Sequence, residues 1–172
     1  MPGLAGSYFG DTLTYLSEHD EDGAMGLVIN RPSELSLIEL LAQLDLPTAG
    51  ISAEVMVMDG GPVSPERGFI LHTDDRRFEA SLELGNGLML SASREALEAI
   101  GAGNGPSSYL VALGYAGWGA GQLEEELKDN AWLSCPANLD VVFREPFSNR
   151  VHQAAAILGI DFRFMSGHAG HA

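Results

Sequence analysis

The apolar residues of this chain come in short runs separated by turn-forming residues, and this spacing limits the possible folds more than any other feature of the sequence. Thr12–His19 alternates polar and apolar side chains, as a half-buried strand does. The turn-forming residues Asp20–Gly23 follow, and then the more apolar run Ala24–Asn30. Two such runs around a short polar turn predict a β-hairpin, which pairs its strands antiparallel.

Several later segments are also predicted to be strands, because they are short, apolar and bounded by turn residues. They are Glu54–Gly61, Gly68–His72, Glu79–Leu84, Gly87–Ser91, Ser108–Tyr115 and Asn138–Phe143. The pair Asn86-Gly87 suits a tight hairpin turn between two of them. Helices are predicted where apolar residues recur at helical spacing or where capping residues stand at the ends. They cover Ser36–Leu44, Ser93–Gly101, Gly121–Asn130 and Asn149–Leu158.

The order of these elements favours an α+β fold. Strands outnumber helices and mostly arrive as hairpins, without the regular alternation of a doubly wound sheet. We therefore predict a mainly antiparallel sheet or partial barrel flanked by helices. The chain has 172 residues, of which 45% are hydrophobic, and no linker divides it, so we expect a single domain over residues 1–172. Its small, polar tail, residues 166–172, is expected to be flexible.

The charge and the cysteine content restrict the partners and the compartment. The chain carries 24 acidic and 9 basic residues, for a formal net charge of −15, which disfavours direct contact with nucleic acid or an anionic membrane. A literal DNA-binding role would need a basic face, for example Arg67, Arg76 and Arg77 aligned. A single cysteine, Cys135, excludes an intramolecular disulfide. With no leader-like start and no apolar run near 18 residues, we expect a cytoplasmic protein that does not enter a membrane.

The segment Gly114–Leu133 places four glycines between an apolar run and an acidic helix. A strand, a glycine turn and a helix can hold a pyrophosphate, but the glycine spacing here does not fit and Glu124–Glu126 would repel a phosphate. We therefore predict no cofactor. The favoured interpretation is that the glycines let the backbone turn sharply and pass close to a neighbour, with Trp118 over an edge of the core and Trp132 on the other side of the helix. The alternative is a pocket in which Tyr115, Trp118 and Gln122 meet a ligand or peptide.

Asn30 and Arg31 follow directly on a predicted buried strand, at a strand end where sites tend to form. Arg31 suits a bidentate grip on a carboxylate or phosphate, and it suits an internal ion pair equally well. The acidic turn Glu18–Gly23 lacks the glutamate that would complete a calcium loop, so we interpret it as solvated. The tail residues His168 and His171 are too few to build a structural metal site, and we predict none.

His72 ends a predicted strand and precedes Asp74 and Asp75. A general base needs an orienting carboxylate of this kind, yet a capped surface histidine is the favoured interpretation. Cys135 has no second cysteine or nearby basic residue in the sequence to lower its pKa, so we expect it to be inert. No G-x-S-x-G signature is present. Catalytic residues therefore stay unassigned.

Three blocks of sequence, taken in order, resemble the bacterial AlgH/YqgE family: Phe9–Pro32, Gly60–His72 and Gly114–Leu133. The resemblance extends over nearly the whole chain. It implies a cytoplasmic α+β protein whose bent sheet includes a small closed barrel. Most members are uncharacterised, and AlgH carries the label of a transcriptional regulator of alginate synthesis, which does not imply a DNA-binding motif. The family supplies no catalytic residue to carry over.

Members of this family usually begin with an additional strand before the position that Met1 and Pro2 occupy here. From that resemblance we expect a sheet edge exposed near Thr12–His19. Such an edge invites homodimerisation or the addition of a partner strand.

We therefore expect a non-catalytic regulatory or interaction protein that binds another protein or a small molecule. The alternative is an enzyme or small-ligand binder with a pocket at the strand ends around Asn30, Arg31 and Trp118, in which His72 or His19 acts as acid or base. The candidate contact residues for both hypotheses are Asn30, Arg31, Gly60, Gly61, His72, Tyr115, Trp118 and Gln122.

Overall fold

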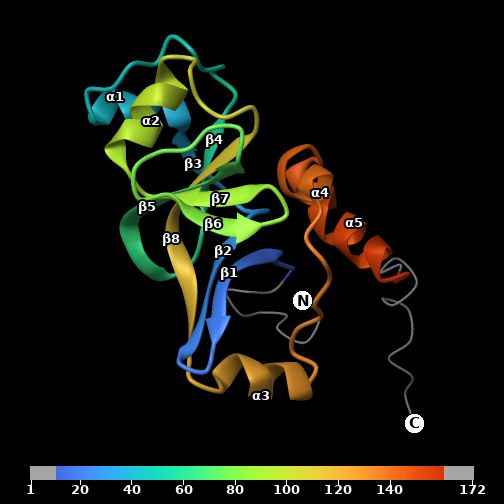
Figure 1. Ribbon diagram of the computed structural model, residues 1–172. Coiled ribbons are helices and arrows are strands. Elements are labelled where there is room, and N and C mark those ends of the chain that lie inside the picture. Colours follow the sequence, from blue (N-terminus) through green and yellow to red (C-terminus); the bar gives the residue numbers. More distant parts are fainter. Residues whose placement is uncertain (1–10, 161–172) are drawn as a thin grey trace.

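A long bent strand organises the structure, a computed structural model that describes residues 11–160 (Figure 1). Within that range an eight-stranded sheet runs in the order β1-β2-β8-β5-β7-β6, with β4 also paired to β8 and β3 paired to β4. The strands are β1 (Thr14–Asp20), β2 (Gly23–Val28), β3 (Pro32–Ser36), β4 (Met56–Asp59), β5 (Val63–Thr73), β6 (Leu82–Gly85), β7 (Leu88–Ser91) and β8 (Tyr109–Gly119). The sheet is antiparallel except for β4 and β8, and it bends until it is nearly closed into a barrel. The predicted α+β fold is confirmed; the tail 166–172 lies outside the described residues.

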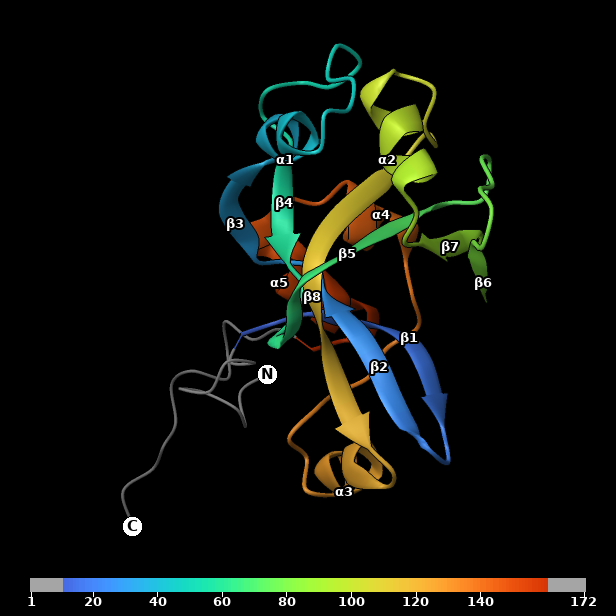
Figure 2. The same ribbon diagram turned by 90° about the vertical axis from the view of Figure 1, so that its left-hand side faces the viewer.

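Strand β8 changes partners along its length, and this is what bends the sheet. Its first part pairs with β5 from His72↔Tyr109 to Val63↔Tyr115, and its last part pairs with β2 from Gly26↔Ala116 to Gly23↔Gly119. In Figure 2 the strand runs from the helices at one end of the molecule to α3 at the other. The glycine-rich segment after Tyr115 therefore continues a strand, and the predicted sharp turn is wrong. The period-two burial of this segment, with Ala116 and Trp118 buried and Gly117 and Gly119 exposed, is that of a strand.

The bend occurs just after β4 ends, where Gly60 and Gly61 cross β8 at very short range. Gly114 has a φ of +76° and Gly61 a φ of +153°, conformations that side chains disfavour. A Cβ atom on Gly61 would lie 2.0 Å from the carbonyl carbon of Tyr115, and one on Gly114 would lie 2.3 Å from the carbonyl oxygen of Gly61. Only glycines allow the two backbones to touch in this way.

Helices α1 (Leu37–Gln43) and α2 (Arg94–Gly101) cover one end of the sheet (Figures 1 and 2). Each begins as predicted: the Ser36 hydroxyl accepts from the Glu39 amide, and the Ser93 hydroxyl accepts from the Ala96 amide, both at 3.2 Å. The two helices pack on a core cluster that includes Leu41, Ile70, Ile100 and Val111. The predicted turn at Asn86-Gly87 is also confirmed, since both residues have positive φ, as a type I′ hairpin requires.

Helix α3 (Gln122–Lys128) lies at the other end of the molecule, while α4 (Leu139–Phe143), the short 3-10 turn η2 (Phe147–Asn149) and α5 (Arg150–Ile157) lie beside the sheet (Figure 1). The predicted strand over Asn138–Phe143 is wrong, because α4 occupies it. The Asn138 side chain accepts hydrogen bonds from the amides of Asp140 and Val141, which nucleates a helical turn despite the β-branched residues that follow. The consecutive valines Val141 and Val142 are both buried, which a one-faced strand could not achieve.

Further differences concern extent. Strand β5 begins five residues before the predicted Gly68, β6 begins three residues after the predicted Glu79, and β3 was not predicted. None of the helices formed by residues 11–160 is both long enough and apolar enough to span a membrane.

Replacing Gly114 with alanine tests the crossing of β4 and β8. We expect Gly114→Ala to lower the free energy of unfolding by about 2–4 kcal/mol, because the new methyl group meets the backbone of Gly61 and the φ is unfavourable. The matched control is Gly121→Ala, where φ is +74° but nothing lies within 4 Å of the added Cβ, so a loss of about 1 kcal/mol is expected. Equal losses in urea unfolding of the two variants would contradict the proposed close approach.

Candidate functional site

The register of the hairpin assigns its side chains to two faces. Leu16 pairs with Gly26, which pairs with Ala116 of β8, so these positions share one face of the sheet, together with Thr14 and Trp118. The neighbouring residue Tyr15 faces the opposite side, where it packs on the main core cluster. Helix α3 covers the first face, and α4 and α5 cover the second.

On the first face, two tryptophans share one carboxylate. The rings of Trp118 and Trp132 stand edge to face with centroids 5.7 Å apart. Both indole N–H groups donate to Glu126 Oε2, at 2.9 and 2.7 Å, and Gln122 Nε2 donates to Glu126 Oε1 at 3.1 Å. The prediction that Trp132 lies on the other side of the helix from Trp118 is therefore wrong, because the chain turns back after α3. The Glu126 carboxylate fixes α3 and the segment after it to β8.

On the second face, a buried arginine fixes α5 to the sheet. Arg150 is 4% exposed; its Nη1 donates to the carbonyl oxygen of Ile29 and its Nε donates to the carbonyl oxygen of Glu145 at 2.9 Å. Burial lowers the pKa of Arg150 to about 10, so the side chain still carries its charge at neutral pH. The guanidinium also lies 4.5 Å from the ring centroid of Phe147.

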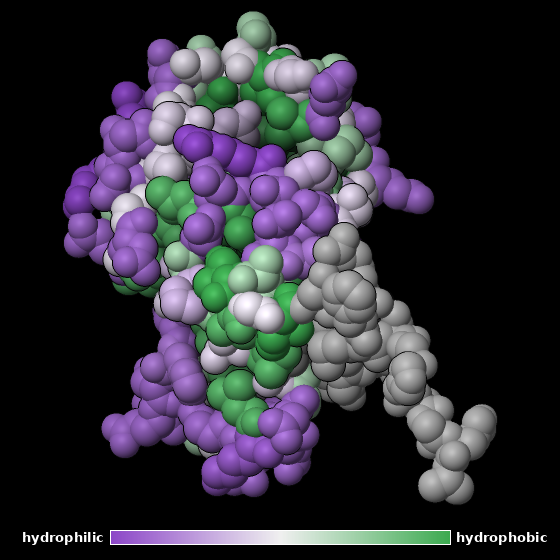
Figure 3. All heavy atoms as spheres, turned by 90° about the vertical axis from the view of Figure 1, so that its right-hand side faces the viewer, coloured by the Kyte–Doolittle hydropathy of each residue, from purple (hydrophilic) through white to green (hydrophobic). Residues whose placement is uncertain are grey.

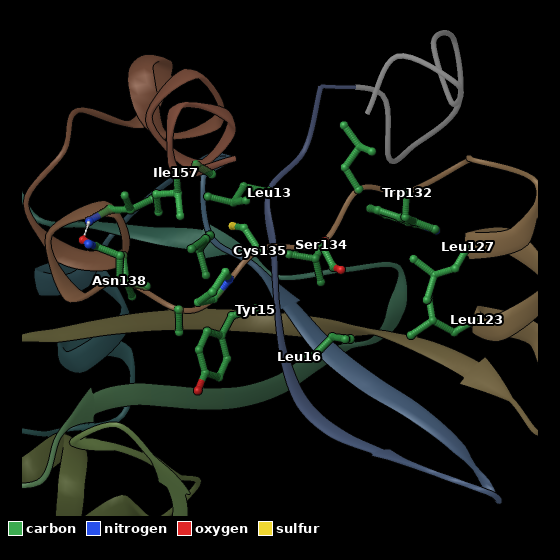
Figure 4. Close-up of a pocket in the computed structure, with 18 of the residues that line it drawn as sticks. Leu13, Tyr15, Leu16, Leu123, Leu127, Trp132, Ser134, Cys135, Asn138 and Ile157 are labelled. Carbon is green, nitrogen blue, oxygen red and sulfur yellow. Dashed lines mark hydrogen bonds between the residues drawn. The ribbon is translucent and has the colours of Figure 1, made fainter. Parts of the chain in front are cut away.

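Between these two anchors lies a cavity of about 270 Å³, which we call the edge cavity. It is lined by Leu13–Leu16 and Ile29, by Trp118 with Leu123 and Leu127 of α3, by the connecting residues Trp132–Asn138, and by Val141, Val142, Ala154 and Ile157 of α4 and α5. Figure 4 shows Leu123, Leu127 and Trp132 on one side of it, Leu13 and Ile157 on the other, and Cys135 between them. None of the lining residues is an Asp, Glu, Lys, Arg or His. The site is therefore apolar and uncharged.

Large apolar side chains are exposed around the edge cavity. Leu16 is 39%, Leu133 44% and Ile157 42% exposed. Figure 3 shows an apolar patch bordered by polar residues on this side of the molecule. Contiguous exposed apolar surface of this kind marks binding sites more often than scattered apolar residues do.

Two polar groups in the wall of the edge cavity have unusual surroundings. Thr14 Oγ1 is buried and has no hydrogen-bond partner among the described residues. Cys135 is half-buried as a free thiol, and burial raises its pKa. The prediction that Cys135 is not an activated nucleophile agrees with this direction of the shift.

The predicted site residues Asn30 and Arg31 lie where strand β2 ends. Asn30 Oδ1 accepts from the Leu13 amide and Asn30 Nδ2 donates to the Asp11 carbonyl oxygen, both at 2.9 Å, so this side chain holds the start of β1. The carbonyl oxygen of Arg31 accepts from the Asp59 amide at 2.8 Å. The Gly60 amide donates to the carbonyl oxygen of Leu113, and the Gly60 carbonyl oxygen accepts from the Val28 amide. Gly60 lies beside Gly61, where the chain after β4 crosses β8.

The structure therefore divides the predicted contact residues into separate groups. Tyr115 packs edge to face on Phe69 in the core, with ring centroids 5.8 Å apart, near the crossing glycines. Trp118 and Gln122 lie at the far end of β8, around Glu126. Of the whole predicted set, Trp118 alone lines the edge cavity. A single pocket around Asn30, Arg31 and Trp118 does not form; whether any of these residues binds a partner stays a prediction.

His72 is fully buried, so the predicted surface histidine is wrong. Its Nδ1 lies 2.8 Å from the carbonyl oxygen of Thr73 and donates to it, and its Nε2 lies 2.7 Å from the Ser91 hydroxyl. Ser91 Oγ lies 2.7 Å from Ser81 Oγ. Asp75 accepts instead from the Thr73 hydroxyl and the Ser107 amide, and these hydrogen bonds lower its pKa. His72 thus has structural partners and no access to a substrate.

His19 lies at the end of β1, with Nε2 2.5 Å from Glu124 Oε1 of α3. Both side chains are exposed, and the hydrogen bond to His19 lowers the pKa of Glu124. Across residues 11–160, no three or more His, Cys, Asp or Glu side chains gather in a way that could hold a metal ion. His168 and His171 lie outside the described residues.

Local sequence patterns do not predict the edge cavity, because its walls come from four distant parts of the chain. Two local signals for elements beside the cavity are present in the sequence: Asn138 is a good helix-capping residue, and the spacing from Gln122 to Glu126 is one helical turn. A second cavity of about 230 Å³ lies between α1, α2 and β5. It is partly closed by Arg94, which donates to the carbonyl oxygen of Leu44.

Known proteins are similar to this chain over its whole length. A family model described as AlgH-like (DUF179) matches residues 1–163. The chain is 50% identical over 174 residues to a UPF0301 protein of Stutzerimonas stutzeri and 49% identical over 172 residues to one of Thioalkalivibrio sulfidiphilus; each alignment covers 100% of this chain and 92% of the relative.

Two solved structures are similar to this one. The solution structure of the AlgH protein from Pseudomonas aeruginosa has a TM-score of 0.81 at 50% identity, covering 100% of this chain and 92% of that chain. The crystal structure of DIP2367 from Corynebacterium diphtheriae has a TM-score of 0.66 at 18% identity, covering 83% and 76%, and shows a likeness of fold alone.

Glu126→Gln tests the anchor that holds α3. Both indole N–H groups donate to one carboxylate oxygen and Gln122 Nε2 donates to the other, so an amide that keeps its oxygen toward the indoles turns its NH₂ group against the Gln122 donor, and all three hydrogen bonds lose the negative charge of their acceptor. We expect a loss of about 2 kcal/mol in the free energy of unfolding, measured in urea by tryptophan fluorescence. The control is Glu125→Gln on the same helix, which removes an exposed pair with Lys128 and should cost at most about 0.5 kcal/mol. A loss no larger than the control's would show that the shared carboxylate is not an anchor.

The reactivity of Cys135 tests the burial of the cavity wall. A raised thiol pKa means less thiolate at each pH, so labelling by iodoacetamide at pH 7 should be slower than for a small free thiol. The rate should reach half its maximum above the ordinary thiol pKa of about 8.5. Because the chain has one cysteine, the signal comes from Cys135 alone. Unfolding in urea is the control and should restore ordinary reactivity; a folded protein that labels as fast as the unfolded one would contradict the structure.

Proposed function

This chain belongs to the AlgH-like family, and from that premise we propose that it is a non-catalytic binding protein whose site is the edge cavity. It would act in the cytoplasm by holding a partner, in a regulatory role. The observation that carries the proposal is a cavity of about 270 Å³ with an uncharged lining and exposed leucine and isoleucine side chains around it.

The size and lining of the cavity favour apolar groups as its contents. Ligand pockets in proteins run from about 300 Å³ upward and are lined mainly by apolar side chains, so this cavity is at the small end of that range. Each 100 Å² of apolar surface removed from water stabilises a complex by about 2.5 kcal/mol. The net charge of −15 and the lack of a lining cation disfavour an anionic ligand, including nucleic acid.

The surroundings of the polar lining groups favour binding over catalysis. Cys135 is the strongest nucleophile in the wall, and the lining includes no acid or base to activate it. His19 pairs with Glu124 at the hairpin end, and His72 is enclosed by Thr73 and Ser91. The acid–base roles that the alternative hypothesis gave to these histidines find no support in this geometry.

A neutral probe molecule tests the site. We expect toluene to shift the indole N–H signals of Trp118 and Trp132 in a heteronuclear NMR titration and to slow the labelling of Cys135, because these side chains line the edge cavity. Ala154→Leu fills part of the cavity from α5 and should weaken toluene binding about fivefold or more.

The matched control is Ala156→Leu on the same helix, where the side chain is exposed and outside the lining, so binding should not change. Toluene that leaves both indole signals and Cys135 unaffected at saturation, or that binds equally to the two variants, would overturn the proposed site.

A further inference from the structure

We propose that the edge cavity receives an extended, cationic segment of a partner protein, which adds as a strand to the outer edge of β1. The segment carries alternate apolar side chains that enter the cavity and Lys or Arg residues beyond them. This inference rests on the proposed binding function and names the chemistry of its partner.

The outer edge of β1 presents backbone groups for such an addition. The carbonyl oxygen of Leu13 accepts from the Ile29 amide, and the Leu13 amide donates to Asn30 Oδ1, so both groups of Leu13 point toward β2. Because this direction alternates along a strand, the N–H and C=O groups of Thr14 and Leu16 point away from β2. Within residues 11–160, β1 pairs with β2 alone.

The edge cavity lies on this outer side of the strand, between β1 and the connection Trp132–Asn138. Four consecutive residues of β1 and its start, Leu13–Leu16, line it, although neighbouring residues of a strand face opposite sides of the sheet. The same cavity touches Leu123 of α3 on the first face and Val142 of α4 on the second. A cavity that reaches both faces must pass around the edge of β1, and so it brings an occupant against the outward backbone groups of Thr14 and Leu16.

An extended peptide suits these groups better than a featureless apolar molecule does. A hydrocarbon would shut backbone N–H and C=O groups away from water without partners, at about 1–3 kcal/mol for each group. A peptide strand supplies those partners and places alternate side chains in the cavity. Thr14 Oγ1, buried and without a partner among residues 11–160, adds a further polar atom at the same place.

The ladder would be short. The register of β1 with β2 shifts between Leu16 and Glu18, and such a bulge re-aims the backbone and ends regular pairing. The outward groups before it belong to Thr14 and Leu16, so an added strand of about four residues is the expected length.

The charge around this edge selects a cationic partner. The strand continues past the bulge into exposed Glu18, Asp20, Glu21 and Asp22, and α3 adds Glu124 and Glu125 near the same end. His19 and Lys128 offset these last two in part. A second copy of this chain would bring the same acidic hairpin and a net charge of −15, so like charges oppose a homodimer built on β1.

The test uses the full-length protein and three synthetic octapeptides with blocked ends. The first has alternating valine and threonine between terminal lysines; the second has the same sequence with every amide between the lysines N-methylated; the third has glutamate in place of lysine. We expect the first to slow Cys135 labelling and to shift the Thr14 and Leu16 amide signals. The dissociation constants of the second and third peptides should each be at least about tenfold higher than that of the first. Added salt should reduce the difference in affinity between the lysine and glutamate peptides.

Two variants of Thr14 distinguish what its backbone N–H contributes to peptide binding from what its side-chain hydroxyl contributes. Thr14→Pro removes the outward N–H, which β2 does not use, and should weaken the first peptide about tenfold while toluene binding persists. Thr14→Val removes only the hydroxyl and keeps the outward N–H, so it should weaken the first peptide less than Thr14→Pro does. If Thr14→Pro fails to fold, the N-methylated peptide on the unaltered protein gives the same comparison.

The outcomes separate this inference from the proposed function. Equal binding of the plain and N-methylated peptides, with Cys135 protected by both, would overturn strand addition and leave an apolar binding site. Protection by toluene but by no peptide would do the same. Peptide binding that requires prior removal of residues 1–10, or a concentration-dependent dimer abolished by Thr14→Pro, would assign the edge to this chain itself. Absence of any protection, by toluene or peptide, would overturn the proposed function as well.

Discussion

The close contact of two backbones at Gly61 and Gly114 is the constraint on which the rest of the structure depends. It lets the chain that follows β4 cross β8 at very short range and bends β8, so that one strand can pair first with β5 and then with β2. Without the bend, the β1–β2 hairpin would continue the plane of the main sheet. With it, the hairpin projects from the barrel-like part with two faces available for helices (Figures 1 and 2).

Two polar anchors then place the helices on those faces. Glu126 accepts hydrogen bonds from the indoles of Trp118 and Trp132 and so fixes α3 to the first face. Arg150 donates to the Ile29 carbonyl oxygen and fixes α5 to the second face. The connection between α3 and α4 must therefore pass around the edge of β1. The edge cavity is the space that remains along this path, which explains why apolar side chains and outward backbone groups meet there.

Local patterns predicted the elements whose signals are complete within a few residues. The β1–β2 hairpin, the serine caps of α1 and α2 and the Asn86-Gly87 turn formed as expected, and the AlgH/YqgE resemblance is confirmed. The prediction failed at Asn138–Phe143, where an asparagine cap outweighed β-branched valines, and at Gly114–Gly119, where a strand continues in place of the predicted turn. The close backbone approach expected of these glycines does occur, at Gly114. His72 was misjudged because its partner Ser91 lies on a neighbouring strand.

The sequence by itself determined the fold class, the family, the acidic charge and most turns and caps, since each follows from composition or from neighbours along the chain. Only the tertiary structure decided that the predicted contact residues separate and that the edge cavity forms elsewhere. The physical reason is distance along the chain: the hydrogen bond that places α5 joins Arg150 to Ile29 across 121 residues, and the walls of the edge cavity extend from Leu13 to Ile157. No window of local sequence contains both members of such a pair.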